Sequence, residues 1–157
     1  MKKVSQILMK AEIALLIVLL LGMVATCFAQ VIFRLVLGHP LAWSEELARY
    51  LFVWLTFIGG SVAIAESAHF KMDLLAFAFK ERGKAILQLI VSICLLSFSI
   101  VLIIYGLPLV KMVSSQKSPA LRISMSIPYF ALPINGFLSS FHCVENIIDD
   151  IKRLKAK

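Results

Sequence analysis

The charged residues best suited to chemistry lie in one short segment, Trp43–Tyr50. Glu45 and Glu46 are adjacent carboxylates, and Arg49 follows Glu45 by four residues. Adjacent side chains diverge on a helix, so these two carboxylates are not expected to act together as general acid and base. The spacing instead predicts an ion pair from Glu45 to Arg49 in the first turns of a helix, with Ser44 as the N-cap.

A second candidate cluster is a polar stripe near the C-terminus. Its members recur every three or four residues and therefore share one face of a helix: Asn135, Ser139, His142, Asn146 and Asp149. Two interpretations are open, a contact surface between helices and a relay for protons or ions in which His142 titrates.

The remaining residue types that bind metals or cofactors are sparse. Cys27, Cys94 and Cys143 lie in separate apolar stretches, without the close spacing of a zinc site or a disulfide framework. His39 and His69 are expected in loops, so a haem held by two histidines within the chain is not expected. We therefore expect no metal and no cofactor.

Composition identifies the kind of element that positions these residues. The 157 residues are 61% hydrophobic and 16% charged, with a mean hydropathy of +0.93. Soluble domains are about 45–50% apolar, and a domain this small buries its surface poorly, so the composition indicates a polytopic membrane protein. Little mass is left for a soluble catalytic domain, so no enzyme is expected. The net charge of +7 is typical of cytoplasmic loops, and nucleic-acid binding is not expected.

Four apolar stretches are each close to the roughly 20 residues that cross a bilayer as a helix. The sequence therefore predicts an all-α, single membrane domain over 1–157, with four transmembrane helices at about 12–36, 44–66, 84–110 and 127–149. The first stretch is longer than the apolar region of a signal peptide and is expected to remain as a helix. Between the second and third spans, the segment 72–79 is apolar with basic flanks, which predicts a short interfacial helix.

The distribution of Lys and Arg predicts the orientation. With four spans, the two termini and the middle loop share one side and carry eleven Lys and Arg residues, against five on the other side. The positive-inside rule then places both termini in the cytoplasm.

Within this arrangement, Trp43–Tyr50 has two open interpretations. It is either a capped helix start, with Trp43 and Tyr50 at the headgroups, or a site where its charges also pair with another helix or subunit. Arg34, at the end of the first span, is the candidate partner within the chain.

Small residues predict where helices approach each other. Gly59 and Gly60 lie in the middle of the second span, and Ser92, Ser99 and Gly106 recur every seven residues in the third.

Several motifs together resemble one family. The run Trp43-Ser-Glu-Glu-Leu-Ala-Arg-Tyr-Leu-Phe-Val-Trp54, then Phe57-Ile-Gly59, then His69-Phe-Lys-Met-Asp73, is similar to the signature of the small, DctQ-type membrane subunit of TRAP transporters. Ser118-Pro-Ala-Leu121 and Leu132-Pro-Ile134 resemble later parts of that family, which often has glycine directly after Pro-Ile, where this chain has Asn135.

The resemblance implies a four-helix subunit of the bacterial inner membrane with no transport site of its own. It implies pairing with a large, M-type membrane subunit that moves substrate with sodium by an elevator motion. A periplasmic, P-type binding protein would deliver an organic acid such as a dicarboxylate, sialic acid or sugar acid. The chain would then be a scaffold in the lipid bilayer, and the motif and stripe residues would lie at subunit or helix contacts.

Two other hypotheses are carried beside it. An autonomous four-helix exporter needs a carboxylate embedded in the membrane, and the first span offers only Glu12, at its inner edge. A membrane anchor of a redox enzyme would show a haem absorbance band or a bound quinone.

Overall fold

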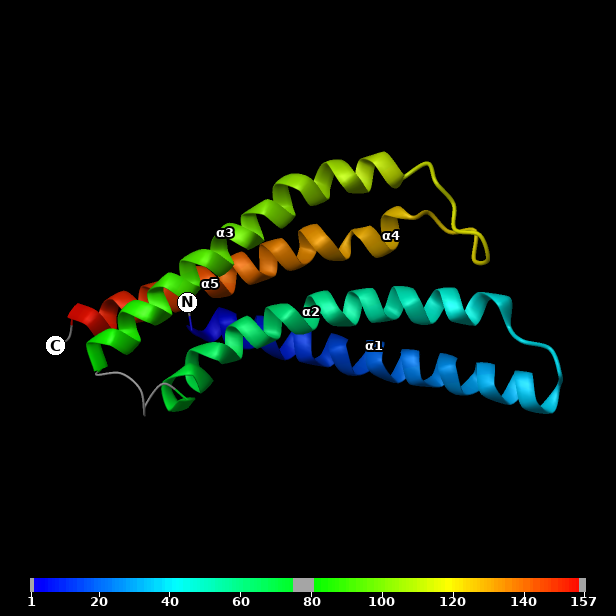
Figure 1. Ribbon diagram of the computed structural model, residues 1–157, viewed down its shortest axis with the longest axis horizontal. Helices are drawn as coiled ribbons and strands as arrows, with labels where there is room; N and C mark the ends of the chain where they lie inside the picture. Colours follow the sequence, from blue (N-terminus) through cyan, green and yellow to red (C-terminus); the bar gives the residue numbers. More distant parts are fainter. Residues whose placement is uncertain (1, 75–80, 156–157) are drawn as a thin grey trace.

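The chain folds into long helices joined by short connections (Figure 1). The computed structural model describes residues 2–74 and 81–155, with side chains described for 5–66, 83 and 86–152. The helices are α1 (Lys2–Val36), α2 (Ala42–Leu74), α3 (Glu81–Val113), α4 (Ser126–Tyr129) and α5 (Ala131–Lys155). Among the described residues the only β pairing is an isolated bridge between Lys117 and Ser124, so the all-α prediction is confirmed.

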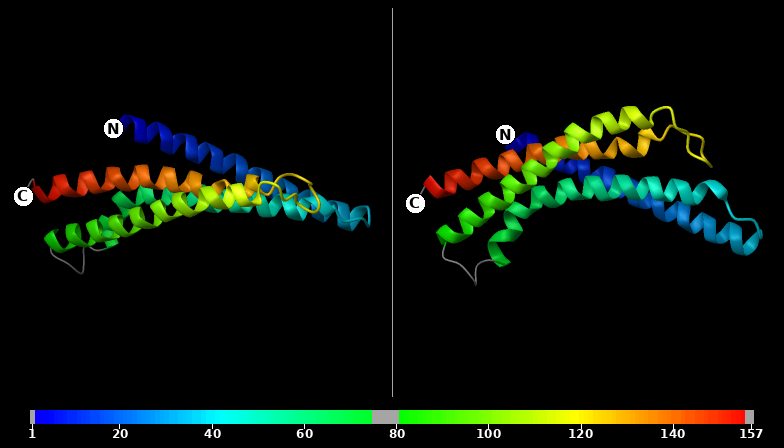
Figure 2. Two further views of the ribbon diagram at one scale, coloured as in Figure 1. Left: turned by 90° about the horizontal axis from the view of Figure 1, so that it is seen from above. Right: turned by 45° about the horizontal axis from the view of Figure 1, so that its top comes forward.

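The helices form two antiparallel pairs. α1 packs on α2, α3 packs on α5, and contacts between α2 and α5 join the pairs. Both termini lie at one end of the bundle, and the α1–α2 and α3–α4 connections lie at the other (Figures 1 and 2). α1 lies at the edge of the bundle and diverges from α5 toward its N-terminus (Figure 2).

Three described helices are long and apolar enough to cross a membrane, over Ser5–Val36, Ala42–Glu66 and Ile86–Val113. α5 is not among them, because its polar stripe lowers its hydropathy. The first three predicted spans therefore match helices of sufficient hydropathy, and the fourth stays a prediction.

Two helix boundaries near prolines differ from the predicted spans. The third span was expected to end near Pro108, but α3 continues to Val113 with this proline inside it. The fourth span was expected as one helix, but it divides at Phe130 into α4 and α5. Pro133 has no N–H to donate to the Tyr129 carbonyl oxygen, so one helical hydrogen bond is missing there, whereas Phe130 N donates to Ser126 O at 2.9 Å and Ile134 N donates to Phe130 O at 3.2 Å.

The structure describes only part of the segment 72–79, which was predicted to form an interfacial helix. α2 continues without interruption to Leu74, so no separate helix begins at Met72. Residues 75–79 of that prediction lie outside the described residues.

The tightest helix contact joins α3 and α5. The small residues predicted to line a face of α3, Ser92, Ser99 and Gly106, are all buried. On α5, a Cβ added to Gly136 would lie 2.9 Å from the Ser99 carbonyl oxygen and 2.7 Å from Ile103 Cγ1. Only glycine allows the two backbones to lie this close.

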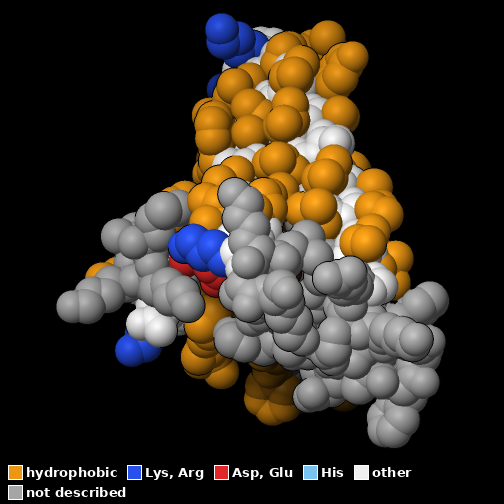
Figure 3. Space-filling view, turned by 90° about the vertical axis from the view of Figure 1, so that its left-hand side faces the viewer, with side chains coloured by type: hydrophobic (Ala, Val, Ile, Leu, Met, Phe, Trp, Pro, Cys, Tyr) orange, Lys and Arg blue, Asp and Glu red, His pale blue; other side chains and the backbone are white. Residues whose placement is uncertain are grey.

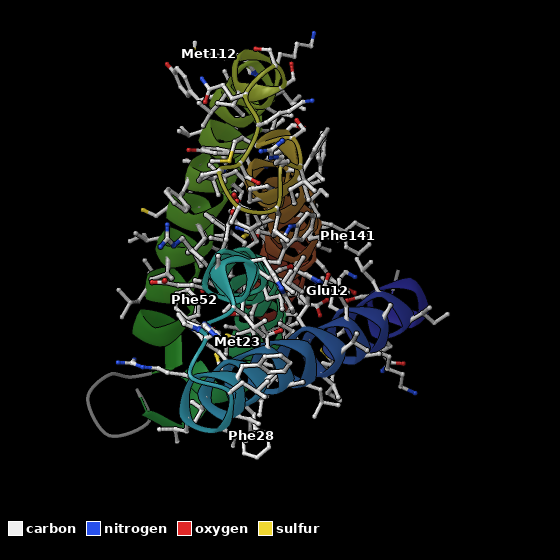
Figure 4. All side chains as sticks on the ribbon, turned by 90° about the vertical axis from the view of Figure 1, so that its right-hand side faces the viewer. Glu12, Met23, Phe28, Phe52, Met112 and Phe141 are labelled. Carbon is white, nitrogen blue, oxygen red and sulfur yellow. The ribbon has the colours of Figure 1, made fainter. Side chains whose placement is uncertain are left out.

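The outer surface of the bundle is apolar. Seen from the end that holds the termini, hydrophobic side chains cover most of the described surface (Figure 3). From the opposite end, Phe28 on α1 and Phe52 on α2 project away from the bundle (Figure 4), with 65% and 57% of their surface exposed. Exposure of this kind matches a lipid or a protein neighbour rather than water.

The close α3–α5 contact predicts opposite effects for two glycine substitutions. Gly136→Ala should lower the midpoint of thermal unfolding, because overpacking of this kind costs about 1–3 kcal/mol. Gly60→Ala is the matched control, because nothing lies within 4 Å of the added Cβ and alanine favours the helix. Thermal unfolding of the purified chain in detergent is the measurement. A Gly136→Ala variant at least as stable as the Gly60→Ala variant would contradict the assigned contact.

Candidate functional site

Glu46 connects the start of α2 to the α3–α4 loop (114–125). Its Oε2 accepts hydrogen bonds from the backbone N–H groups of Ala120 at 2.8 Å and Leu121 at 3.1 Å. The Tyr50 hydroxyl, one helical turn further on, donates to Glu46 Oε1. Only 8% of the Glu46 surface is exposed. Two successive N–H groups around a carboxylate form an anion-binding concavity, and hydrogen bonds to a charged acceptor are stronger than neutral ones.

The α3–α4 loop is folded so that these N–H groups face Glu46. A hairpin is closed by the hydrogen bond from Ser118 N to Ile123 O at 2.9 Å, and Met125 N donates to Gln116 O at 2.9 Å. Arg122 turns the chain with a φ of 53°, a conformation that costs most residues about 1 kcal/mol. The loop is therefore a defined structural element.

The predicted local interactions at the start of α2 are replaced by others. α2 begins at Ala42, so Ser44 is not the N-cap; its buried hydroxyl donates to the Leu41 carbonyl oxygen at 2.7 Å. Glu45 and Arg49 are both exposed, and no ion pair joins them within the described part of the chain. Arg34 is exposed and pairs with neither glutamate among those residues.

The other motif residues have mixed environments. Trp43 is 41% exposed and Trp54 is half-buried. A Cβ on Gly59 would meet Leu16 of α1 at 3.9 Å, whereas Gly60 faces open space; the buried positions beside them are Ile58, Ser61 and Val62. The expectation that His69 lies in a loop was wrong, because α2 continues to Leu74 and includes both His69 and Asp73. The side chains of these two residues are outside the described set.

The polar stripe of α5 faces the interior of the bundle. Asn135, Ser139 and His142 are each less than 8% exposed. Ser139 donates to Asn135 Oδ1 at 2.9 Å, and Asn146 Nδ2 donates to the Ile64 carbonyl oxygen of α2 at 3.1 Å. The stripe therefore serves contacts between helices of the chain itself.

The sequence analysis found no partner for His142, and the structure supplies one. Its Nε2 lies 3.2 Å from Glu12 Oε1 of α1, and both residues are at most 4% exposed. Glu12 lies between α1 and α5 (Figure 4). The sequence did show that Glu12 is the one carboxylate of the first span. Glu12 and His142 are 130 positions apart, however, and no helical periodicity relates positions so distant.

These groups provide rigidity rather than reactive chemistry. No group of three or more potential metal ligands occurs among the described residues. Glu46 is held by three donors, and Glu12 and His142 contact each other inside the bundle. Neither cluster combines a nucleophile with a base.

Comparison with known proteins assigns this arrangement to a family. The family model of the DctQ component of tripartite ATP-independent periplasmic transporters matches residues 23–153. The chain belongs to this family. It is a small permease subunit of a TRAP transporter, a non-enzymatic membrane component that works with a large membrane subunit and a periplasmic binding protein.

Individual relatives agree with the assignment. A TRAP transporter small permease protein of Haemophilus influenzae is 30% identical over 99% of this chain and 94% of its own length. The sialic acid TRAP transporter small permease protein SiaQ of Vibrio cholerae is 27% identical over 98% of this chain and 89% of its length. The isethionate TRAP transporter permease protein DctMQ of Oleidesulfovibrio alaskensis is 29% identical over 70% of this chain, which matches only 18% of that longer protein. Membership removes the basis for the autonomous exporter and the redox anchor.

Loss of the Glu46 carboxylate should free the α3–α4 loop. In Glu46→Ala, the N–H groups of Ala120 and Leu121 lose their acceptor, so a cysteine introduced at Ser118, which is only 2% exposed, should react with a thiol reagent on the order of tenfold faster, as expected for loss of such bonds. Glu45→Ala is the matched control, because this neighbouring carboxylate is exposed and makes no such contact. Equal labelling rates in the two variants would show that Glu46 does not hold the loop.

The Glu12–His142 contact should behave as a coupled pair. Glu12→Leu or His142→Leu alone leaves the other polar group buried without its partner, which destabilises a protein by about 3–5 kcal/mol. The double variant should recover part of this loss, because both polar groups are gone. Thermal unfolding midpoints of the four proteins measure the coupling, and additive effects of the two substitutions would contradict it.

Proposed function

We propose that the chain is the fixed scaffold of an uptake system in the bacterial inner membrane. In this proposal the large subunit binds an organic acid, moves it together with sodium in an elevator motion, and receives it from the periplasmic binding protein. The chain itself holds the stationary part of the large subunit in the bilayer.

The observation that carries this proposal is the use of the buried polar groups. Glu46, Asn146 and the Glu12–His142 pair each join different elements of the chain, which favours one rigid bundle. A carrier with its own substrate site often has a pair of interrupted helices at the membrane centre, whereas α1, α2 and α3 run unbroken through their apolar stretches. The apolar outer surface of this bundle suits an element that stays fixed while a neighbour moves.

The substrate class rests on the relatives. Two of them are named for isethionate and sialic acid, which are both organic anions. An organic acid is the substrate class consistent with both names, and the specificity would reside in the partner subunits.

Topology is part of the proposal. α5 is 25 residues long, about 37 Å at the helical rise, which is enough to cross the roughly 30 Å hydrocarbon core together with α1, α2 and α3. Its buried stripe explains how a helix with this many polar residues could cross. Both termini lie at one end of the bundle, and the Lys and Arg count favours the cytoplasm for that end.

Crosslinking combined with transport tests the scaffold role. Cysteine pairs that join this chain to the stationary domain of the large subunit should leave sodium-dependent uptake largely intact. Pairs that join the moving and stationary domains of the large subunit are the control and should abolish uptake. Loss of uptake with the first set would overturn the scaffold role.

The same cells test the topology. Cysteines in Lys2→Cys and Lys155→Cys should react with an impermeant reagent only after the cells are opened. Labelling of either position in intact cells would overturn the proposed orientation.

A further inference from the structure

An open groove lies between α2 and the segment formed by the α3–α4 loop, α4 and the start of α5. Its volume is about 570 Å³, within the range of binding pockets. Ten residues line it, and most of them are apolar or aromatic: Glu46, Arg49, Tyr50, Val53, Phe57, Pro119, Met125, Pro128, Tyr129 and Leu132.

Arg49 gives the groove a positively charged side chain that contacts no anionic group of the described chain. Glu46 is the only other charged residue in the lining, and its two oxygens accept hydrogen bonds from Tyr50, Ala120 and Leu121. Arg49 is exposed, and it makes no hydrogen bond or ion pair within the part of the chain that the structure describes. The donors of the Arg49 guanidinium are therefore free to bind an anionic group in the groove.

The position of Arg49 makes it unfavourable for its charge to face lipid without a partner. It lies inside Ala42–Glu66, one of the helices able to cross a membrane. An arginine that faces hydrocarbon destabilises a spanning helix, most strongly at the membrane centre, so such residues pair with an anion or reach the headgroups.

The walls of the groove are held in place before any partner arrives. Glu46 fixes Ala120 and Leu121 next to Pro119, and the Tyr50 hydroxyl lies 3.2 Å from Met125 Sδ. Pro128 is buried, and its ring limits motion of α4. A preformed site avoids the entropic cost of ordering its walls on binding.

We propose that this groove receives a membrane-embedded segment of the large subunit, which places a carboxylate against Arg49 and apolar side chains against Val53, Phe57 and Leu132. The inference rests on the proposed function and names one surface and one ion pair within it. The lining favours a protein over a lipid, because aromatic residues, methionine and arginine are the types enriched in protein interfaces.

Photocrosslinking in the assembled transporter tests the occupant. Benzoylphenylalanine in place of Val53 should form a covalent adduct with the large subunit. The same group in place of Phe52 is the matched control, because Phe52 is adjacent on α2, exposed and outside the groove lining. An adduct of phospholipid mass alone at position 53, or equal crosslinking from both positions, would overturn the proposal.

Charge substitutions test the ion pair. Arg49→Gln should reduce the amount of large subunit that co-purifies with the tagged chain about tenfold, because one carboxylate is left without its partner. Arg49→Lys should restore much of it, and Arg34→Gln, which removes an exposed cation elsewhere, should have no effect. Undiminished co-purification with Arg49→Gln overturns the ion pair but leaves the scaffold role standing. Failure of the wild-type chain to retain the large subunit would overturn both.

Discussion

A polar side chain that faces hydrocarbon loses its hydrogen bonds to water, and this constraint sets how the helices of the chain are arranged. α5 carries too many polar groups to be surrounded by lipid, so its stripe turns inward toward α1 and α2. α5 also packs closely against α3, because Gly136 has no side chain and lets the α5 backbone lie near the Ser99 carbonyl oxygen. α5 is thus the central helix of the bundle, although it is the least apolar of the four long helices.

The same constraint acts again at the end of the bundle that holds the loops. Glu46 is an ionisable residue near the start of a spanning helix, and it is buried because backbone N–H groups from the α3–α4 loop surround it. The carboxylate thus contacts the backbone of the loop, and Pro119 and Met125 of the same loop line the groove beside Arg49. The hydrogen bonds of Glu46 and the groove beside Arg49 therefore involve the same loop.

Together these features support the scaffold role proposed above. The polar groups are used to hold the chain's own helices and loop, and the outer surface is apolar. The groove differs from both, because its mostly apolar lining includes Arg49, which contacts no anionic group within the described chain. The apolar outer surface suits contact with lipid, whereas the groove with Arg49 suits the proposed contact with a partner protein.

The sequence by itself determined the class of protein, the first three spans and the family, because composition, span length and the Trp43–Asp73 motifs are local properties. It also determined that the stripe of α5 shares one face, because helical periodicity requires only spacing. It did not determine what these residues touch. Glu46 meets a loop 74 residues away and Glu12 meets His142 across 130 residues, and no periodicity relates such positions. Ser44 was predicted as an N-cap, but α2 begins two residues earlier, at Ala42. The fourth span was predicted as one helix, but α4 and α5 meet at Phe130, close to Pro133, which has no N–H to donate. Only the tertiary structure decides such contacts, since a buried polar group takes whichever partner packing brings near it.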